Sequence, residues 1–208
     1  MKTYIINGKE GIGKTDFSVN LAEYLQKTGK VLLLQTKRNP NSNIEDYFQK
    51  DGMITYDIGD YFSSLAPLEK VIVHENENLD FIISPLLEDK YIFRGEDVEK
   101  LLGEISYDYL VIDNLSKDLI KDKIIIEIID TDSLNKEIEG DYFFINKASE
   151  DYDIRNDKNA IEAKNKRFLG LVKNGQYFND VIENLLEDKK IEIPKISFFE
   201  KIKMAFKH

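Results

Sequence analysis

The chain lacks cysteine and tryptophan, and it has only two histidines and four prolines among its 208 residues. Without cysteine there is no disulfide, no thiolate zinc site and no cysteine nucleophile. The two histidines, His74 and His208, do not fall into a pattern that predicts a Ser/His/Asp catalytic set. No run of about 18 apolar residues occurs, so the sequence predicts no membrane-spanning helix. These absences exclude thiol chemistry and argue against histidine-based catalysis.

Basic residues are also in deficit. The chain has 29 Lys and Arg against 39 Asp and Glu, a net charge of −10. Non-specific binding to nucleic acid needs clustered Lys and Arg, so we expect no nucleic-acid partner. Charged residues make up 33% and apolar residues 42%, a mix typical of one soluble α/β domain. The first residues lead directly into a predicted strand, so we expect no signal peptide and a cytoplasmic location.

One glycine-rich segment carries a recognisable motif. Residues Gly8 to Thr15 read G-K-E-G-I-G-K-T and match G-x-x-x-x-G-K-[ST], the phosphate-binding P-loop. An apolar run at 4–6 precedes the loop and a helical pattern at 17–26 follows it. A strand that turns into a helix N-terminus directs backbone N–H groups at one point, which suits polyphosphate. Lys14 would contact the terminal phosphates and Thr15 would hold Mg²⁺; the alternative is a glycine-rich turn without a ligand.

Strand and helix patterns alternate along the chain. Strands are predicted at 3–7, 30–34, 79–84, 109–112, 124–129, 142–146 and 168–172, and helices at 15–28, near Tyr47, at 95–103 and at 179–187. The segment 149–167 is polar and predicts a loop with one surface helix. Alternation of this kind predicts an α/β fold with a mainly parallel sheet of about seven strands and helices on both faces.

The strand that ends at Asp113 could complete the nucleotide site. Residues 109–113 read Y-L-V-I-D, four apolar residues followed by a carboxylate, as in a Walker B strand. Asp113 would then lie at the carboxyl end of the sheet, beside Thr15, and hold Mg²⁺ with it. The alternative is an aspartate that only caps the next helix.

The loop and the later strands resemble the MinD/ParA ATPases. Lys9 corresponds to the second lysine of their deviant Walker A motif, which usually reads G-K-G-G-x-G-K-T-[ST]. Ile145-Asn146-Lys147 matches the strand end that carries the adenine-reading Asn of that family, and 168–172 matches its penultimate strand. The resemblance implies a P-loop NTPase that binds ATP or ADP with Mg²⁺. The nucleotide would contact Gly8, Lys9, Glu10, Gly11, Ile12, Gly13, Lys14, Thr15, Asp16 and Asn146, with Lys9 and Lys14 as catalytic lysines and Thr15 and Asp113 as metal ligands.

The resemblance further implies a homodimer that meets through the nucleotide face, with Lys9 reaching the partner's nucleotide. It implies a spatial regulator that positions the division site or polar machinery together with another protein. A nucleotide-insensitive scaffold of the TadZ/CpaE type is the alternative. A small P-loop kinase is disfavoured because no acceptor pocket or arginine-rich lid is evident.

Four residues depart from the family pattern. Gln35 and Lys37 occupy the positions of the two aspartates of the usual D-x-D switch, while Glu10 and Asp16 add negative charge near the phosphates. A protonated lysine cannot act as a base at neutral pH or orient water as a carboxylate does. We therefore expect weak or absent ATP hydrolysis and weakened nucleotide binding. Alternatively, Lys37 points to solvent and other groups support hydrolysis.

The C-terminal segment 194–208 forms a second predicted unit beside the nucleotide-binding domain 1–193. At 100° per residue its apolar side chains, Met204 excepted, fall on one face of a helix, with Lys203 and Lys207 opposite. We expect it to target the membrane through Phe198, Phe199, Ile202, Phe206, Lys201, Lys203 and Lys207. The alternative is a last helix docked on the sheet. Membrane targeting would place the protein in the cytoplasm, peripherally at the inner face of the cell membrane.

Overall fold

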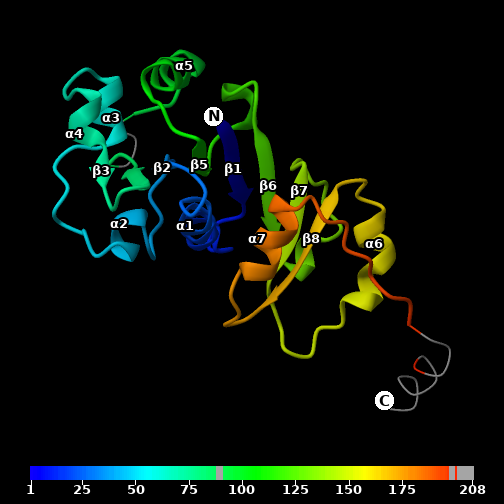
Figure 1. Cartoon of the computed structure of the whole chain (residues 1–208). Coiled ribbons are helices and arrows are strands. Elements are labelled where there is room, and N and C mark those ends of the chain that lie inside the picture. Colours follow the sequence, from blue (N-terminus) through cyan, green and yellow to red (C-terminus); the bar gives the residue numbers. More distant parts are fainter. Residues whose placement is uncertain (88–90, 197–199, 201–208) are drawn as a thin grey trace.

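A computed structural model describes residues 1–87, 91–196 and 200 (Figure 1). The strands of its sheet are β1 (Lys2–Gly8), β2 (Val31–Gln35), β3 (Val73–His74), β4 (Leu79–Ile82), β5 (Tyr109–Asp113), β6 (Ile124–Ile129), β7 (Tyr142–Ala148) and β8 (Arg167–Lys173). Their order across the eight-stranded sheet is β3-β4-β2-β5-β1-β6-β7-β8, and only the β3–β4 pair is antiparallel. The predicted α/β class with a mainly parallel sheet is confirmed.

Helices cover both faces of this sheet. They are α1 (Lys14–Leu25), α2 (Ile44–Tyr47), α3 (Ile58–Phe62), α4 (Leu68–Val71), α5 (Gly95–Glu104), α6 (Lys158–Glu162) and α7 (Asn179–Leu186). Short 3₁₀ turns lie at Lys117–Leu119, Thr131–Ser133 and Ile154–Asp157. Successive strand side chains point to opposite faces, so Tyr4 and Ile6 pack in one core cluster and Ile5 in another. Helices α1, α2 and α7 cover the first face, and α3, α4 and α5 cover the second.

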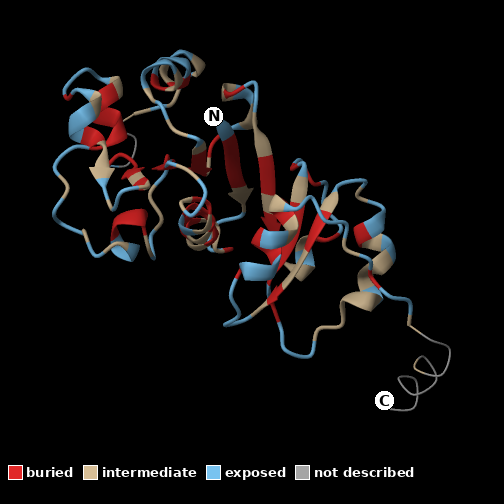
Figure 2. Ribbon diagram, in the orientation of Figure 1, coloured by how far each residue is buried: buried red, intermediate tan, exposed pale blue. Residues whose placement is uncertain are grey.

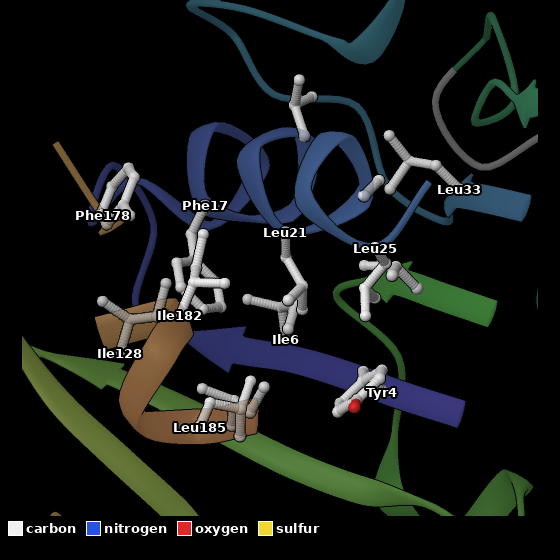
Figure 3. Close-up of a cluster of buried hydrophobic side chains, with 14 of the residues drawn as sticks. Tyr4, Ile6, Phe17, Leu21, Leu25, Leu33, Ile128, Phe178, Ile182 and Leu185 are labelled. Carbon is white, nitrogen blue, oxygen red and sulfur yellow. The ribbon is translucent and has the colours of Figure 1, made fainter. Parts of the chain in front are cut away.

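The packing around α1 fixes the start of that helix. Phe17 has its ring centroid 4.8 Å from that of Phe144 on β7 and 5.3 Å from that of Phe178 beside α7. Leu21 and Leu25 continue the apolar face of α1 over β1, as Figure 3 shows. The central strands are red along much of their length in Figure 2 because both faces are covered; all five residues of β2 are buried. This core holds the loop between β1 and α1 against the sheet.

The strand register brings three distant segments to one edge. Ile6 and Gln35 both pair with Asp113 across the parallel ladders β1–β5 and β2–β5. The loop after β1, the segment after β2 and Asp113 therefore share the carboxyl edge of the sheet. Open α/β sheets bind ligands at this edge.

Three elements lie outside the sequence prediction. Strand β3 is a two-residue antiparallel edge pairing, in which Val73 and His74 face Phe81 and Asp80; a pair this short has no periodicity to detect. Helices α3 and α4 have only five and four residues. Helix α3 nevertheless has a local signal, because Asp57 and Asp60 form a reciprocal capping box. The sheet thus has eight strands where about seven were predicted.

The predicted membrane-targeting residues lie outside the described part of the chain. They are Phe198, Phe199, Lys201, Ile202, Lys203, Phe206 and Lys207. Residues 191–196 form neither helix nor strand, and Glu200 pairs with Arg155 at 2.7 Å. Within residues 1–87, 91–196 and 200, no helix is long and apolar enough to cross a membrane.

Candidate nucleotide-binding site

The loop from β1 to α1 needs glycine at two close approaches. Gly13 has a φ of 95°, and a Cβ there would lie 2.8 Å from Nδ2 of Asn146. Gly8 has a φ of 150°, and a Cβ there would lie 2.5 Å from the carbonyl oxygen of Ile128. A residue with a Cβ would strain the backbone or collide with its neighbours at both positions. The two glycines therefore let the loop fold closely over the ends of β6 and β7.

Side chains of the protein hold the loop through its carbonyl groups. Asn146 donates from Nδ2 to the Ile12 carbonyl at 2.8 Å, and Lys147 donates from Nζ to the Gly11 carbonyl at 2.7 Å. No side chain in the described ranges caps the N-terminus of α1. The first N–H groups of a helix have no partner within the helix. The loop thus leaves the helix N-terminus available to an anion.

Thr15 and Asp113 meet as the sequence predicted. The Thr15 hydroxyl donates to Oδ2 of Asp113 at 2.6 Å, and both residues are buried. Gln35, also buried, places its Nε2 3.4 Å from the same carboxylate oxygen. The second oxygen, Oδ1 of Asp113, is buried and has no hydrogen-bond partner among the residues described.

Burial raises the pKa of Asp113, although Thr15, Lys14 and Gln35 act in the opposite direction. A buried carboxylate oxygen without a partner costs stability, which a cation beside it would recover. Mg²⁺ binds through one or two protein oxygens together with phosphates and water. The Thr15 hydroxyl and the free Asp113 oxygen fit that ligand set.

The two lysines of the loop are bonded within the protein. Lys14 donates from Nζ to the carbonyls of Gly8 and Lys9 at 3.0 and 2.9 Å. Burial lowers the pKa of Lys14, while Asp113 and Glu10 partly offset it. Lys9 is paired with Asp130, which follows β6. Both ammonium groups therefore have to leave these partners in order to contact a nucleotide.

Asp130 was not predicted from the sequence. Its side chain also accepts from Ser133 N at 3.0 Å, so it caps the turn Thr131–Ser133. Burial acts to raise the pKa of Asp130, but the bonds from Lys9 and Ser133 outweigh it and lower the pKa below the ordinary range. A capping aspartate after a strand was the only signal that could have identified it.

A cavity of about 280 Å³ lies over the loop. It is lined by the loop residues Gly8, Glu10, Gly11, Lys14 and Thr15, by residues 37–40 after β2, and by Asp113 and Asn114. Lys37, placed in the family's switch position, therefore faces the same cavity as Lys14. Glu10 is an exposed carboxylate of its lining.

A second cavity, of about 380 Å³, borders α1 at Asp16 and Asn20. Asn146 and Lys147 line it together with the turn after β8, where Tyr177 is 84% exposed. Burial raises the pKa of Asp16, with Tyr47, Lys147 and Asn20 lowering it in part. Asn146 thus lies where a base could approach, but its amide nitrogen is engaged by Ile12.

The turn 174–178 was missed as part of the site. Gln176 and Tyr177 line the second cavity with Asn146. Gly175, with a φ of 76°, marks the turn in the sequence, but no motif identified its side chains with a ligand. Metal-ligand clusters of three or more His, Cys, Asp or Glu are absent from the described residues.

Comparisons with known proteins agree with the resemblance. No protein-family model matches the chain. The septum site-determining protein MinD of Helicobacter pylori is 27% identical over 114 residues, 53% of this chain and 42% of that protein. An arsenical pump-driving ATPase of Aquifex aeolicus is 30% identical over 136 residues, 54% of this chain and 45% of that protein. The matches thus span less than half of either relative.

Two solved structures share the fold. A Borrelia burgdorferi plasmid partition protein bound to AMPPNP has a TM-score of 0.65 and 20% identity, covering 90% of this chain and 98% of that one. The MinC:MinD cell division protein complex of Aquifex aeolicus has a TM-score of 0.64 and 16% identity, covering 91% and 90%. The predicted resemblance to MinD/ParA-type P-loop ATPases is confirmed in sequence and in fold.

The raised pKa of Asp113 generates a stability prediction. A carboxyl group whose folded-state pKa lies above its unfolded value stabilises the fold below the unfolded pKa, and this contribution is lost as pH rises through the folded pKa. Asp113→Asn keeps an acceptor for Thr15 and removes the buried charge. We expect the variant without nucleotide to be at least as stable as the parent chain at pH 7.5, by up to about 1 kcal/mol.

Thermal unfolding at pH 5 and pH 7.5 measures the stability difference between Asp113→Asn and the parent chain. The stability difference between the two chains should shrink at the lower pH, because the parent carboxyl group is then closer to its neutral form. Glu99→Gln, which removes an exposed carboxylate on α5, is the control for loss of one charge elsewhere. A variant that is less stable at both pH values by the same amount would contradict the assignment.

Proposed function

We propose that this chain is a MinD/ParA-type nucleotide-dependent switch that associates peripherally with the membrane and positions other cellular machinery. The division site or a polar apparatus is the target that the family resemblance suggests. The observation that carries the proposal is the bond between Thr15, at the start of α1, and Asp113, at the end of β5. It brings the glycine-rich loop and a buried carboxylate to one edge of the sheet, which supports binding of phosphate and Mg²⁺ there.

The chain's own residues divide the work of binding. The N–H groups at the start of α1 receive phosphate oxygens, and Lys14 moves from the loop carbonyls to the terminal phosphates. Thr15 and Asp113 would hold Mg²⁺, which would supply positive charge to the phosphates. Asn146 and the turn with Tyr177 would border the base.

Lys9 offers a route from nucleotide to dimer. Its side chain is 54% exposed and pairs with Asp130 at the rim of the loop. Exposed ion pairs contribute little to stability, about 0–1 kcal/mol, so the pair can be exchanged. We propose that Lys9 leaves Asp130 and contacts the nucleotide of a second copy, as the family resemblance implies.

The named relatives support a positioning role. The Helicobacter relative is named for determining the septum site, and the Borrelia structure is of a plasmid partition protein that binds AMPPNP. The Aquifex MinD structure contains a protein partner, MinC. By analogy the chain would have an unidentified protein partner. Its charge of −10 argues against non-specific binding to DNA.

A nucleotide-insensitive scaffold is the second candidate. It is favoured by the internal bonds of the site, since Lys14, Lys9 and Lys147 all have partners within the protein. Glu10 adds negative charge where phosphates would bind, which costs on the order of 1 kcal/mol at close range, whereas Asp16 lines the second cavity. In this function the fold serves as a platform, and the protein's own cations hold the loop in its present conformation.

Dimerisation separates these two functions. We expect Mg-ATP to convert the monomer to a dimer on size exclusion with light scattering, while ADP leaves it monomeric. Lys14→Ala should abolish the shift because it removes the phosphate contact, and Lys9→Ala should abolish the dimer while leaving ATP binding within about tenfold. Lys70→Ala, an exposed change in α4, is the control. A dimer that forms equally with and without nucleotide supports the scaffold instead.

Hydrolysis should be slow. Lys37 and Gln35 cannot orient water as the two aspartates of the family switch would. We expect phosphate release at least about 1,000-fold below the roughly 10 s⁻¹ of a typical enzyme. The Lys14→Ala variant defines the background. Robust turnover by the parent chain, absent from that variant, would refute this expectation.

Membrane attachment is tested with vesicles. Sedimentation with anionic phospholipid vesicles should carry down the full chain in the presence of Mg-ATP, because two weak anchors on a dimer act together. A chain ending at residue 196 should stay in the supernatant. The same experiment with zwitterionic vesicles shows whether sedimentation depends on the negative charge of the lipid. Equal sedimentation of the full and shortened chains would show that residues 197–208 are not the anchor.

A further inference from the structure

The phosphate cavity has an unusual balance of charge. Its charged lining consists of the cations Lys14, Lys37 and Arg38 and the carboxylates Glu10 and Asp113. Arg38 is paired with Glu45, so the remaining formal charges, two lysines and two carboxylates, balance. An aspartate at position 37, as in the family switch, would instead leave an excess of two negative charges. Only the latter arrangement depends on a divalent ion to make the cavity attractive to a polyphosphate.

The backbone before Lys37 is fixed against the metal-binding strand. Thr36 donates from its backbone N–H to the Asp113 carbonyl at 3.2 Å, and its hydroxyl donates to the Asn114 carbonyl, with the Asp113 carbonyl oxygen 3.3 Å away. Thr36 is buried, whereas Lys37 is exposed at the rim. The lysine side chain thus starts from a fixed point beside Asp113 and has room to follow a ligand.

The residue after Lys37, Arg38, is held by an ion pair. Arg38 pairs through Nη2 with Glu45 at 2.7 Å, and the Glu45 side chain is only 3% exposed. Its other terminal nitrogen, Nη1, is buried and has no hydrogen-bond partner in the described chain. The segment after β2 therefore presents two cations to the cavity, an exposed lysine and an arginine held by an ion pair.

Lys37 and Lys14 also act on each other. Both side chains line the same cavity of about 280 Å³. Two ammonium groups that face one cavity repel each other until an anion lies between them. A terminal phosphate would relieve this repulsion and bind both.

We propose that Lys37 supplies, from within the protein, part of the positive charge that Mg²⁺ supplies at the terminal phosphates in a MinD/ParA-type site, so that the chain binds nucleoside triphosphate largely without a divalent ion. The inference rests on the proposed function, because it assumes that the loop binds such a nucleotide. Asp113 and Thr15 still accept Mg²⁺ when it is present, but binding does not require it. Lys37 is then a determinant of how the site recognises its ligand.

Calorimetric titration with ATP, in Mg²⁺ and in EDTA, tests the proposal. The proteins are the full chain, Lys37→Ala, Lys37→Asp and the exposed α4 control Lys70→Ala. For the parent chain and the control, EDTA should weaken ATP binding by less than about fivefold. For Lys37→Asp, EDTA should weaken ATP binding by about fiftyfold or more, because the charge beside the phosphates is reversed. For Lys37→Ala, the loss of affinity in EDTA should lie between that of the parent chain and that of Lys37→Asp. Thermal unfolding of each protein checks that the variants fold.

Three outcomes decide between the ideas. Mg²⁺-tolerant binding in the parent chain that becomes Mg²⁺-dependent in Lys37→Asp supports the role of Lys37. Equal dependence on Mg²⁺ in the parent chain and both Lys37 variants overturns that role while nucleotide binding by the loop stands. The absence of ATP binding by the folded parent chain, with and without Mg²⁺, overturns this inference and the proposed switch together.

Discussion

The hydrogen bond of 2.6 Å from Thr15 to Asp113 connects the two halves of the candidate site. It depends on the parallel register that sets Ile6 and Gln35 opposite Asp113, and this register in turn depends on apolar strands covered on both faces. The bond is buried, so neither partner exchanges it freely for water. A change that moved β5 by one residue would remove the carboxylate from the loop and point its neighbours to the wrong face.

The cations of the loop stabilise its present conformation. Lys14 and Lys147 are bonded to loop carbonyls, and Lys9 is bonded to Asp130. A polyphosphate would replace at least the bonds of Lys14, so its affinity is the difference between new contacts and those given up. Lys37 differs because it is exposed at the rim of the cavity. This contrast explains why the departures from the family motif bear on binding as well as on hydrolysis.

Much of the fold could be predicted because its strands are strongly apolar. Strand β6 has the predicted bounds, and β1, β2, β5, β7 and β8 differ from prediction by only one or two residues at an end. Edge strand β3 and helices α3 and α4 are too short to give a period, and their placement depends on tertiary contacts. The segment 149–167 shows the predicted surface helix as α6.

The site was predictable where a motif fixes spacing along the chain. Thr15 and Asp113 lie together because a strand-loop-helix motif and a strand ending in aspartate occupy neighbouring positions in one sheet. Asp130 and the turn at Tyr177 were not predictable, since they reach the site through loops whose paths the sequence pattern does not fix. Asn146 was identified by its position at a strand end, but its hydrogen bond to the Ile12 carbonyl could be seen only in the structure.

The most direct measurement is a crystal structure of the full chain grown with Mg²⁺ and excess AMPPNP. The account predicts phosphates at the N-terminus of α1, with the Nζ atom of Lys14 moved from the Gly8 and Lys9 carbonyls to a phosphate oxygen. Density for the terminal phosphate should lie within reach of Lys37. A cavity that stays empty, with Lys14 still bonded to the loop carbonyls, would contradict the account and leave the scaffold as the function of this fold.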